Sequence, residues 1–594
     1  MRKILLSICF ALISLGMHAS KANSLPVVVT QPDGITLTVM LHGDENVSWY
    51  TALDGTLLVN EGGNYYVAEV SDNGSLTASS ILAHDPLQRT QTEANLALAQ
   101  DKLAFVRYAS PLLGQAGAPS LFAQHHGLTK QMQIRNDSTL FPHVGSPKAL
   151  VILVEFSDSL FTISNPKASF NDYLNNESGD IANRGNGENK NPKGVRGYFK
   201  DISFGKFSPE FDLVGPVRLQ HPMSYYGAGN DNTNALVRDA CNAIDDSVDF
   251  SQYDSNNDGY VDLVYVIYAG HSESESGNNR NDIWPKSGYG SFGTYDGKTV
   301  YRYGVNNELN GRETSRNKYI NGIGLFCHEF SHCMGLPDVY ATDGSVGYNA
   351  DNFGMEYWDV MDGGEYVRSG RYPTAYTAWE REVMGWTSVD TLSDTTHVEM
   401  AYIDKENDSL ARAYKVVNPS VSNEAFYLQN IQNQGWNRYL PGHGLLAYRV
   451  SYSKDDVYFL DNPNNGSKPR IVCIPADGRL GAMASYSGDP TPENYYADMA
   501  GDTYPGTTGN DSIPFFITYA GDSIVKPLLN IKEENEIVSF DFLGAKRIVD
   551  AIANVKVDNK ADGKIYNING QFVGTDPARL PKGLYIMNGK KVIL

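Results

Sequence analysis

The sequence is poor in cysteine and has no long apolar run after its first residues. Five cysteines occur in 594 residues, and Cys9 lies within the N-terminal apolar segment. The other four are too few for a disulfide scaffold in so long a chain: Cys241, Cys327, Cys333 and Cys473. Beyond residue 22 no segment reaches the ~18 apolar residues that span a bilayer. At this length we expect several domains, each with its own hydrophobic core, and we expect no transmembrane helix.

Positive charge is also scarce. The chain has 48 Lys and Arg against 69 Asp and Glu, which gives a formal net charge of −21. Phosphate binding needs clustered Lys and Arg, so nucleic acid is not an expected partner. The acidic excess favours solubility and leaves carboxylates for cations such as Ca²⁺.

The first 22 residues have the form of a secretory signal peptide. Arg2 and Lys3 precede the apolar run Ile4–Gly16, and the small residues Ala19 and Ala22 follow. Cleavage after either alanine fits the small-residue rule. We expect the mature protein to be secreted and extracellular, either soluble or associated with a cell surface without a transmembrane helix.

The most informative stretch is HEFSHCMGLPD. Its two histidines, His328 and His332, are spaced i, i+4, which places both imidazoles on one face of a helix. Two such nitrogens can hold one Zn²⁺ from the same side. Glu329 lies between them, where its carboxylate can reach a metal-bound water as general base.

The residues after the second histidine end this helix and supply a third ligand. Gly335 takes left-handed dihedrals at low cost, and Pro337 cannot continue the helix. The chain therefore turns sharply and can return Asp338 to the metal. A rival scheme takes the third ligand from a glutamate further along the chain, as in thermolysin-like enzymes: Glu356, Glu365 or Glu380.

The extended motif, H-E-x-x-H-x-x-G-x-x-H/D, resembles the metzincin clan of zinc proteases. Within that clan, GLPDVY and YWDVMDGG (Tyr357–Gly364) resemble the immune inhibitor A family of secreted metalloproteases, and the similarity extends over about residues 25–545. The resemblance implies Asp338 as third zinc ligand and a methionine turn at Met361 beneath the metal. Some metzincins place a transition-state tyrosine two residues after that methionine. Here that position is Gly363, and Tyr366 is a substitute.

A second ion site is predicted in DSNNDGYVD, which resembles an EF-hand calcium loop. Oxygen donors occupy positions 1, 3, 5 and 9, Gly259 permits the turn at position 6, and a backbone carbonyl fills position 7. Position 12 is Tyr265 rather than the bidentate glutamate. The predicted Ca²⁺ ligands are Asp254, Asn256, Asp258, Tyr260 (through its carbonyl) and Asp262, and an ion-free Asp/Asn-rich turn is the alternative.

Three other features of the sequence carry expectations about particular residues. Cys327 and Cys333 lie on other helix faces than the histidines, so we expect them in the core and unbridged. The polar segment Gly270–Gly288 is expected to be exposed, with His271 at the surface. A third cation could be held by acidic residues whose spacing fits no motif: Asp343, Asp351, Asp359 and Asp362.

The fold class is multidomain: an α+β metzincin-like protease domain, with a mixed sheet and an active-site helix, followed by an all-β sandwich. The expected parts are a signal peptide (1–22), a propeptide-like α+β N-terminal domain (23–140), the catalytic domain (141–388), the sandwich (389–545) and a C-terminal β tail (546–594). The tail is either a sorting module or two packed hairpins.

Helices and strands are expected at particular segments. The strands are Gly34–Leu41, Asn64–Val70, Ala149–Phe156 and Leu263–Gly270. The helices are Gln88–Lys102, Pro166–Asn176, Val195–Ser203, Ala235–Ile244 and Pro373–Trp386.

The family resemblance implies that the N-terminal domain is a propeptide, which we expect to act as the enzyme's own inhibitor; a simple binding module is the alternative. The domain has no cysteine, which excludes a thiol-to-zinc latency switch. Its acidic groups and histidines remain candidate blockers: His42, His84, His125 and His126.

The expected function is that of a secreted zinc-dependent endopeptidase, made as a zymogen, that acts on proteins or peptides. The alternative is a catalytically silent surface protein with the same fold, which binds a partner through its sandwich or is stabilised by Ca²⁺. The intact His328, Glu329 and His332 favour the enzyme.

Overall fold

The computed structural model of the chain describes most of the protein in two compact units, Met1–Gly544 and Ala545–Leu594. The described residues are 17–19, 22–23, 26–43, 47–109, 140–177, 179, 191–227, 232–276, 281–311, 318–341, 354–406, 409–452, 462–465, 468–479, 497–545, 564–567, 572–587 and 590–593.

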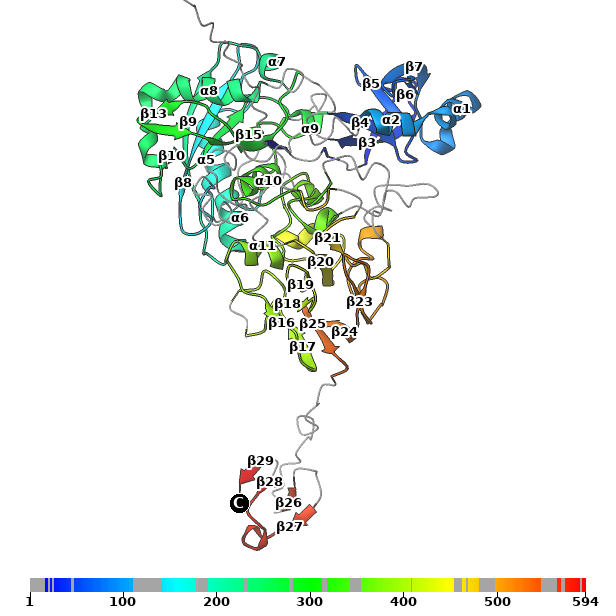
Figure 1. Cartoon of the computed structure of the whole chain (residues 1–594), viewed down its shortest axis with the longest axis vertical. Helices are drawn as coiled ribbons and strands as arrows, with labels where there is room; N and C mark the ends of the chain where they lie inside the picture. The colour runs from blue at the N-terminus through cyan, green and yellow to red at the C-terminus, as the bar shows by residue number, and fades with distance from the viewer. Residues whose placement is uncertain are drawn as a thin grey trace, which may run out of the picture. The chain divides into compact units, whose positions relative to one another are not determined.

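The N-terminal domain is a meander of six antiparallel strands with two helices (Figure 1). The strands follow one another in sheet order: β2 (Val27–Thr30), β3 (Thr36–Gly43), β4 (Ser48–Ala52), β5 (Leu57–Glu61), β6 (Asn64–Val70) and β7 (Leu76–Leu82). The 3₁₀ turn η1 (Pro86–Gln88) leads into α1 (Gln91–Ala99) and α2 (Lys102–Ala109). The strands predicted at Gly34–Leu41 and Asn64–Val70 are confirmed.

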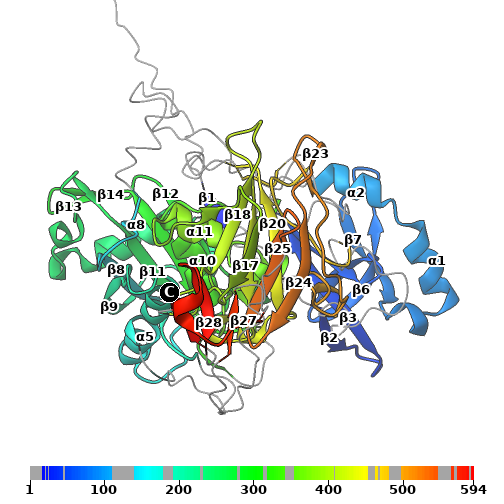
Figure 2. The same cartoon turned by 90° about the horizontal axis from the view of Figure 1, so that it is seen from below.

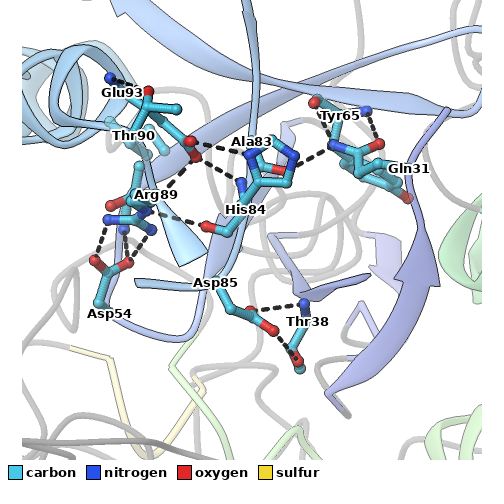
Figure 3. A network of polar contacts seen from close by, with 12 residues as sticks. Gln31, Thr38, Asp54, Tyr65, Ala83, His84, Asp85, Arg89, Thr90 and Glu93 are labelled. Atoms are coloured by element: carbon cyan, nitrogen blue, oxygen red, sulfur yellow. Dashed lines mark hydrogen bonds and ion pairs between the residues drawn. The ribbon is translucent and has the colours of Figure 1, made fainter. Parts of the chain in front are cut away.

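A buried polar network fastens α1 to this sheet (Figure 3). The imidazole of His84 bonds Glu93 Oε2 of α1 at 2.9 Å and Asp33 Oδ2 at 2.8 Å. The His84 backbone N–H also donates to Glu93 Oε1 at 2.6 Å. Burial lowers the pKa of His84, but the two carboxylates outweigh burial and raise its pKa above the ordinary value. The network therefore stabilises the domain most when His84 is protonated.

The catalytic domain is built on a mixed six-stranded sheet, in the order β1-β12-β15-β11-β8-β9. Four strands are parallel, and β12 and β1 are antiparallel additions at one edge. Their bounds are β1 (Met17–Ala19), β8 (Lys148–Glu155), β9 (Glu210–Arg218), β11 (Val264–Tyr268), β12 (Lys286–Tyr289) and β15 (Arg302–Asn307). A small sheet holds β10 (Tyr260–Val261), β13 (Thr294–Tyr295) and β14 (Lys298–Val300).

Helices cover both faces of this sheet, as expected for parallel strands that are apolar on both sides. On β8, Val151 and Leu153 share one buried cluster with α5 (Pro166–Asn175), α6 (Val195–Ile202) and α10 (Gly324–Cys333). The alternate residues Ile152 and Val154 share a second cluster with α8 (Thr233–Ile244). The alternation follows from the two-residue period of a strand. The other helical segments are α7 (Met223–Tyr226), η2 (Asp245–Ser247), η3 (Phe250–Tyr253), α9 (Glu273–Ser276), η5 (Glu356–Trp358), η6 (Gly363–Tyr366) and α11 (Ala378–Val383).

The prediction that Gly270–Gly288 is exposed is wrong. His271 is only 6% exposed, and Ser272, Glu273 and Ser274 are fully buried. The described residues of the segment form α9 and the strand β12, which lies between β1 and β15, and the N-terminal domain packs on them: the N–H of Asn23 donates to the Ser274 carbonyl at 3.3 Å. Local composition cannot reveal cover that comes from residues more than two hundred positions away.

The β-rich region after the catalytic domain contains two sheets that share one buried cluster. The first is β16 (Asp390–Thr391), β18 (Ala413–Val417), β19 (Ala425–Ile431), β20 (Gly444–Val450) and β21 (Ile471–Cys473). The second is β17 (Thr396–Met400), β25 (Ile537–Phe542) and β24 (Leu528–Glu534), which run side by side in Figure 2. A short hairpin, β22 (Phe516–Ile517) and β23 (Ser523–Ile524), completes the region.

This region also packs directly on the catalytic domain. In η7 (Gly435–Tyr439), Trp436 packs edge-on against Tyr198 of α6, with ring centroids 5.0 Å apart. Its indole N–H donates to Asp201 at 3.0 Å, and the strand residues Tyr427 and Tyr448 belong to the same cluster as α10. The catalytic helix is therefore supported from the β-rich side as well as from its own sheet.

The C-terminal unit is a single antiparallel sheet in the order β27-β26-β28-β29. Its strands are β26 (Ile565–Asn567), β27 (Phe572–Gly574), β28 (Leu584–Met587) and β29 (Lys590–Ile593). The two predicted hairpins thus combine into one sheet. Across the described part of the chain, no helix is long and apolar enough to cross a membrane.

Candidate metal centre

The helix that carries the two histidines ends in a tight glycine cap. α10 spans Gly324–Cys333, and all ten of its residues are buried. Gly335 has φ +103°, its N–H donates to the His332 carbonyl at 2.9 Å, and the Leu336 N–H donates to the Ser331 carbonyl at 3.1 Å. This pair of bonds is a Schellman cap, which requires the left-handed residue. The predicted helix end at Gly335 is thus observed.

The cap brings three ligand atoms together. His328 Nε2 and His332 Nε2 are 3.2 Å apart, and Asp338 Oδ1 lies 3.3 Å from the first and 3.2 Å from the second. Ligands about 2.0–2.1 Å from a tetrahedral Zn²⁺ are separated by about 3.3 Å. The three atoms therefore already have the spacing that a zinc ion requires. In the described residues they form the one group of three or more His, Cys, Asp or Glu side chains that could hold a metal.

Backbone carbonyls hold both imidazoles with Nε2 directed to this point. His328 Nδ1 bonds the Val360 carbonyl at 2.8 Å, and His332 Nδ1 bonds the Leu336 carbonyl at 2.7 Å. Each carbonyl makes Nδ1 the donor and leaves Nε2 free of hydrogen as the metal ligand. The His332 bond comes from the Schellman loop itself, so that loop both ends the helix and orients a ligand.

The turn that contains Met361 contacts the first histidine through the Val360 carbonyl. Val360 directly precedes Met361, which is fully buried. The Met361 carbonyl accepts from Val339 N–H at 2.9 Å, one residue beyond Asp338. Asp359 Oδ1 accepts from Met361 N–H at 2.7 Å and holds the turn in shape. The turn therefore links the chain segments that carry His328 and Asp338.

The surroundings of the site are strongly negative. Burial lowers the pKa of His328, but Glu365, Asp338 and Glu329 outweigh burial and raise its pKa to about 10. Glu365 Oε2 lies 3.8 Å from His328 Nδ1, and its carboxylate is fully buried. A buried site with this charge favours a cation, and two imidazoles with carboxylates suit Zn²⁺.

Glu329 and Tyr366 are placed beside the three ligands. Glu329 is fully buried on α10, and its charge contributes to the raised pKa of His328. Tyr366 of η6 is 3% exposed, and burial followed by Glu365 and Glu275 raises its pKa well above the ordinary value. Ser274 lies within hydrogen-bonding reach of the Tyr366 hydroxyl, and the charge of Glu329 also acts on that hydroxyl.

The rival glutamates lie elsewhere. Glu365 approaches His328 from the Nδ1 side of its ring, away from the three ligand atoms. Glu380 caps α11, where its Oε2 accepts from Thr377 N–H at 2.7 Å and Thr377 Oγ1 at 2.9 Å. Glu356 is 9% exposed in η5 and does not belong to the ligand group. The geometry favours Asp338 as third ligand.

The predicted calcium loop is folded around internal bonds. Asp254 accepts from the N–H groups of Asp258 and Gly259 and from Lys298 Nζ at 2.5 Å. Asn256 Oδ1 also accepts from Asp258 N–H, at 3.0 Å, and Asp258 Oδ1 accepts from Tyr260 N–H at 2.9 Å.

The last predicted calcium ligand is engaged in the same way. Asp262 Oδ2 accepts from Ser255 N–H, and burial raises the pKa of Asp262 to about 6. The Lys298 ammonium thus stands where a cation would bind Asp254, and calcium at this loop stays a prediction.

The remaining predicted residues are placed as follows. Cys241, Cys327, Cys333 and Cys473 are all buried and unbridged, which confirms the core packing expected for Cys327 and Cys333. His42 and His84 bond within the N-terminal domain, to Thr51 and to two carboxylates respectively. Four named residues lie outside the described ones: His125, His126, Asp343 and Asp351.

The sequence does not predict that the carbonyls of Val360 and Leu336 bond the two histidines, or that Glu365 lies on the Nδ1 side of His328. No sequence motif marks a carbonyl that supports a ligand, and from the sequence Glu365 is only an alternative third ligand. A signal did exist: Glu365 directly follows a Met-Asp-Gly-Gly turn that the motif placed beneath the metal.

Comparison with known proteins gives three similarities. The model of the immune inhibitor A peptidase M6 catalytic domain matches residues 141–387. The pre-pro-metalloprotease PrtV of Vibrio cholerae serotype O1 (strain M66-2) is 25% identical over 219 residues, 32% of this chain and 23% of that protein. Immune inhibitor A of Bacillus thuringiensis subsp. alesti is 26% identical over 242 residues, 35% of this chain and 34% of that protein. The matches thus span about a quarter to a third of the length of these relatives.

Proposed function

We propose that this chain, whose residues 141–387 belong to the immune inhibitor A peptidase M6 family, is a zinc-dependent endopeptidase exported in a latent form. The observation that carries the proposal is the triangle of His328 Nε2, His332 Nε2 and Asp338 Oδ1, with sides of 3.2–3.3 Å. Of the two relatives, one is named a pre-pro-metalloprotease and the other immune inhibitor A, and the first name agrees with the proposed metal-dependent activity.

The chain's own residues supply the rest of the chemistry. Zinc, when bound, would lower the pKa of a water and neutralise negative charge that develops on the peptide oxygen. Glu329 accepts the proton of the attacking water and delivers it to the leaving amine. The Tyr366 hydroxyl is a neutral donor at every working pH, because its pKa is well above the ordinary value. Its role in this proposal is to donate a hydrogen bond to the developing oxyanion.

Protein or peptide substrates fit the sheet edge beside the site. β12 is antiparallel to β15 and contacts α10, so an extended chain can pair with its outer edge next to the metal. Such pairing supplies affinity through the main chain and leaves specificity to side-chain pockets.

Export and latency complete the proposal. Residues 1–22 are a signal peptide, and residues 23–140 are a propeptide that inhibits the catalytic domain until it is removed. The basis is the cleavage pattern at Ala19 and Ala22, together with the contact of Asn23 with Ser274 beside the site. Calcium at Asp254–Asp262 is a further, separate proposal, in which the ion displaces Lys298.

The test is hydrolysis of a denatured general protein substrate by the activated chain. Wild type and Glu329→Ala are compared, each with and without a zinc chelator. We expect activity only in untreated wild type, while Glu329→Ala keeps its zinc. Activity in Glu329→Ala would refute the base assignment. No activity in folded, zinc-loaded wild type would favour the silent, partner-binding alternative.

A further inference from the structure

One residue of the catalytic domain belongs to the hydrophobic core of the N-terminal domain. Trp284 is fully buried, and its cluster otherwise consists of N-terminal residues. These residues, named here the N-terminal core, are Ala22, Leu37, Val39, Leu41, Tyr50, Ala52, Leu58, Tyr65, Val67 and Ala83. An indole buried in the core of another domain is the type of contact that dominates binding at interfaces.

Trp284 is fixed on its own side by the catalytic domain. The neighbouring residue Ile283 is fully buried. The Ile283 carbonyl accepts from Tyr268 Oη at 2.6 Å and from Glu273 N–H at 3.2 Å, and β12 begins two residues after Trp284. Because Tyr268 is in the central strand β11, the indole is presented from a rigid base. A pre-positioned side chain loses little conformational entropy on burial and so contributes more to affinity.

Near Trp284, a series of hydrogen bonds connects the N-terminal domain with residues beside the metal centre. Ala22 N–H donates to the Gly43 carbonyl at 3.1 Å, and Asn23 N–H donates to Ser274 at 3.3 Å. Ser274 in turn lies within hydrogen-bonding reach of Tyr366 beside the metal centre. The N-terminal domain therefore contacts Ser274, a residue that interacts directly with Tyr366, the neighbour of Glu365.

The outer edge of β12 is covered in the same arrangement. β1 pairs with it antiparallel, Met17 opposite Gly288 and Ala19 opposite Lys286. Cleavage of the signal peptide at either predicted position removes β1 (Met17–Ala19), and cleavage after Ala22 also removes Ala22, whereas Trp284 and the other nine residues of the N-terminal core remain. Among the contacts of the described residues, those of Trp284 with its core and of Asn23 with Ser274 then still join the N-terminal domain to the catalytic domain.

We propose that Trp284 is the anchor of an intramolecular docking interface, and that its partner is the N-terminal core of the same chain. The interface holds the N-terminal domain over the β12 edge and excludes an extended substrate even after the segment 110–139 is cut. Cutting that segment alone therefore does not activate the enzyme, and the N-terminal domain must also dissociate or be degraded. The consequence for turnover rests on the proposed function, but the docking itself does not.

The test uses the full chain with Glu329→Ala, so that no result depends on activity. A recognition site for an unrelated protease is placed within 110–139, the chain is cut, and the affinity of the two fragments is measured over a dilution series. We expect them to stay associated in this parent protein. Trp284→Ala should weaken the association by about 10²- to 10³-fold, as for a truncated buried indole, and Trp284→Phe by less.

Trp436→Ala is the matched control, because Trp436 is comparably buried but packs on Tyr198, away from the N-terminal domain. It should destabilise the catalytic domain and leave fragment association unchanged. Circular dichroism of each separated fragment verifies folding. Equal affinity for the parent and Trp284→Ala proteins would overturn the proposal, as would release of the fragments from the parent on cutting. If Trp284→Ala misfolds, the intermediate affinity of Trp284→Phe decides.

A matching activity measurement separates this inference from the proposed function. In the Glu329-intact chain, hydrolysis of a short peptide is followed after the cut. We expect little activity until dilution releases the N-terminal domain, and earlier onset in Trp284→Phe. Full activity immediately on cutting, with the fragments still associated, would refute the blocking role and leave the zinc endopeptidase intact. No activity at any dilution, with docking intact, would refute the endopeptidase instead.

Discussion

Among the possible substitutions, removal of the third ligand has the effect on zinc affinity that can be estimated most directly from the geometry of the site. In Asp338→Ala the two histidines keep their carbonyl partners, Val360 and Leu336, so the rest of the site retains its shape. Structural zinc sites bind with about 10–16 kcal/mol in total over four protein ligands, which is about 3–4 kcal/mol for each. Loss of one ligand should weaken zinc binding by about 10²- to 10³-fold.

The assay is competition for zinc against a chelating dye, with stoichiometry and affinity determined for both proteins at one pH. Glu365→Gln is the matched comparison, because Glu365 lies 3.8 Å from His328 on the side away from the ligand atoms. As a supporting carboxylate it should cost about 10- to 100-fold in affinity. Unchanged affinity in Asp338→Ala would refute the ligand assignment. Complete loss of zinc in Glu365→Gln would favour the alternative in which a glutamate further along the chain is the third ligand.

Three further outcomes are expected. Gly324→Ala places a Cβ 1.9 Å from a backbone oxygen of η6 and should lower the thermal midpoint far more than Gly363→Ala, whose new Cβ has the Tyr357 ring as its nearest neighbour, at 3.2 Å. Equal midpoints in the two variants would contradict this packing. Because the pKa of His84 is raised, its network stabilises the N-terminal domain fully below about pH 6.5 and is lost as pH rises through that raised pKa. In His84→Gln the thermal midpoint, measured by circular dichroism, should depend less on pH. An unchanged pH dependence would show that the His84 network does not stabilise the domain in this way. Calcium should raise the thermal midpoint of wild type but not of Asp254→Ala, and no shift in either would eliminate the calcium site.

The metal centre could be predicted because its parts lie close together in sequence. The i, i+4 spacing of two histidines, a glycine that must take positive φ and an aspartate three residues later define the geometry within one short segment. Local rules of helix geometry and capping are sufficient there. The helices and strands of the catalytic domain can be predicted for the same reason, because the apolar periodicity that marks each one lies within a short stretch of sequence.

The features that sequence reasoning missed are contacts between distant segments. Gly270–Gly288 is polar and rich in serine and glycine, yet most of its described residues are buried, and the N-terminal domain packs on it at Asn23 and around Trp284. The β-rich region was expected as a separate sandwich, yet Trp436 joins the catalytic core. Hydrophobic patterns indicate that a residue is buried but not which distant surface buries it.

The central claim is tested most directly by turnover as a function of bound zinc. Activated wild type is stripped of metal and zinc is returned in steps, with bound metal and hydrolysis of a denatured protein measured on the same samples. The account predicts that activity rises in proportion to zinc and saturates at one equivalent, while Glu329→Gln binds the same equivalent and stays inactive. Activity in stripped wild type, or comparable turnover by zinc-loaded Glu329→Gln, would contradict it.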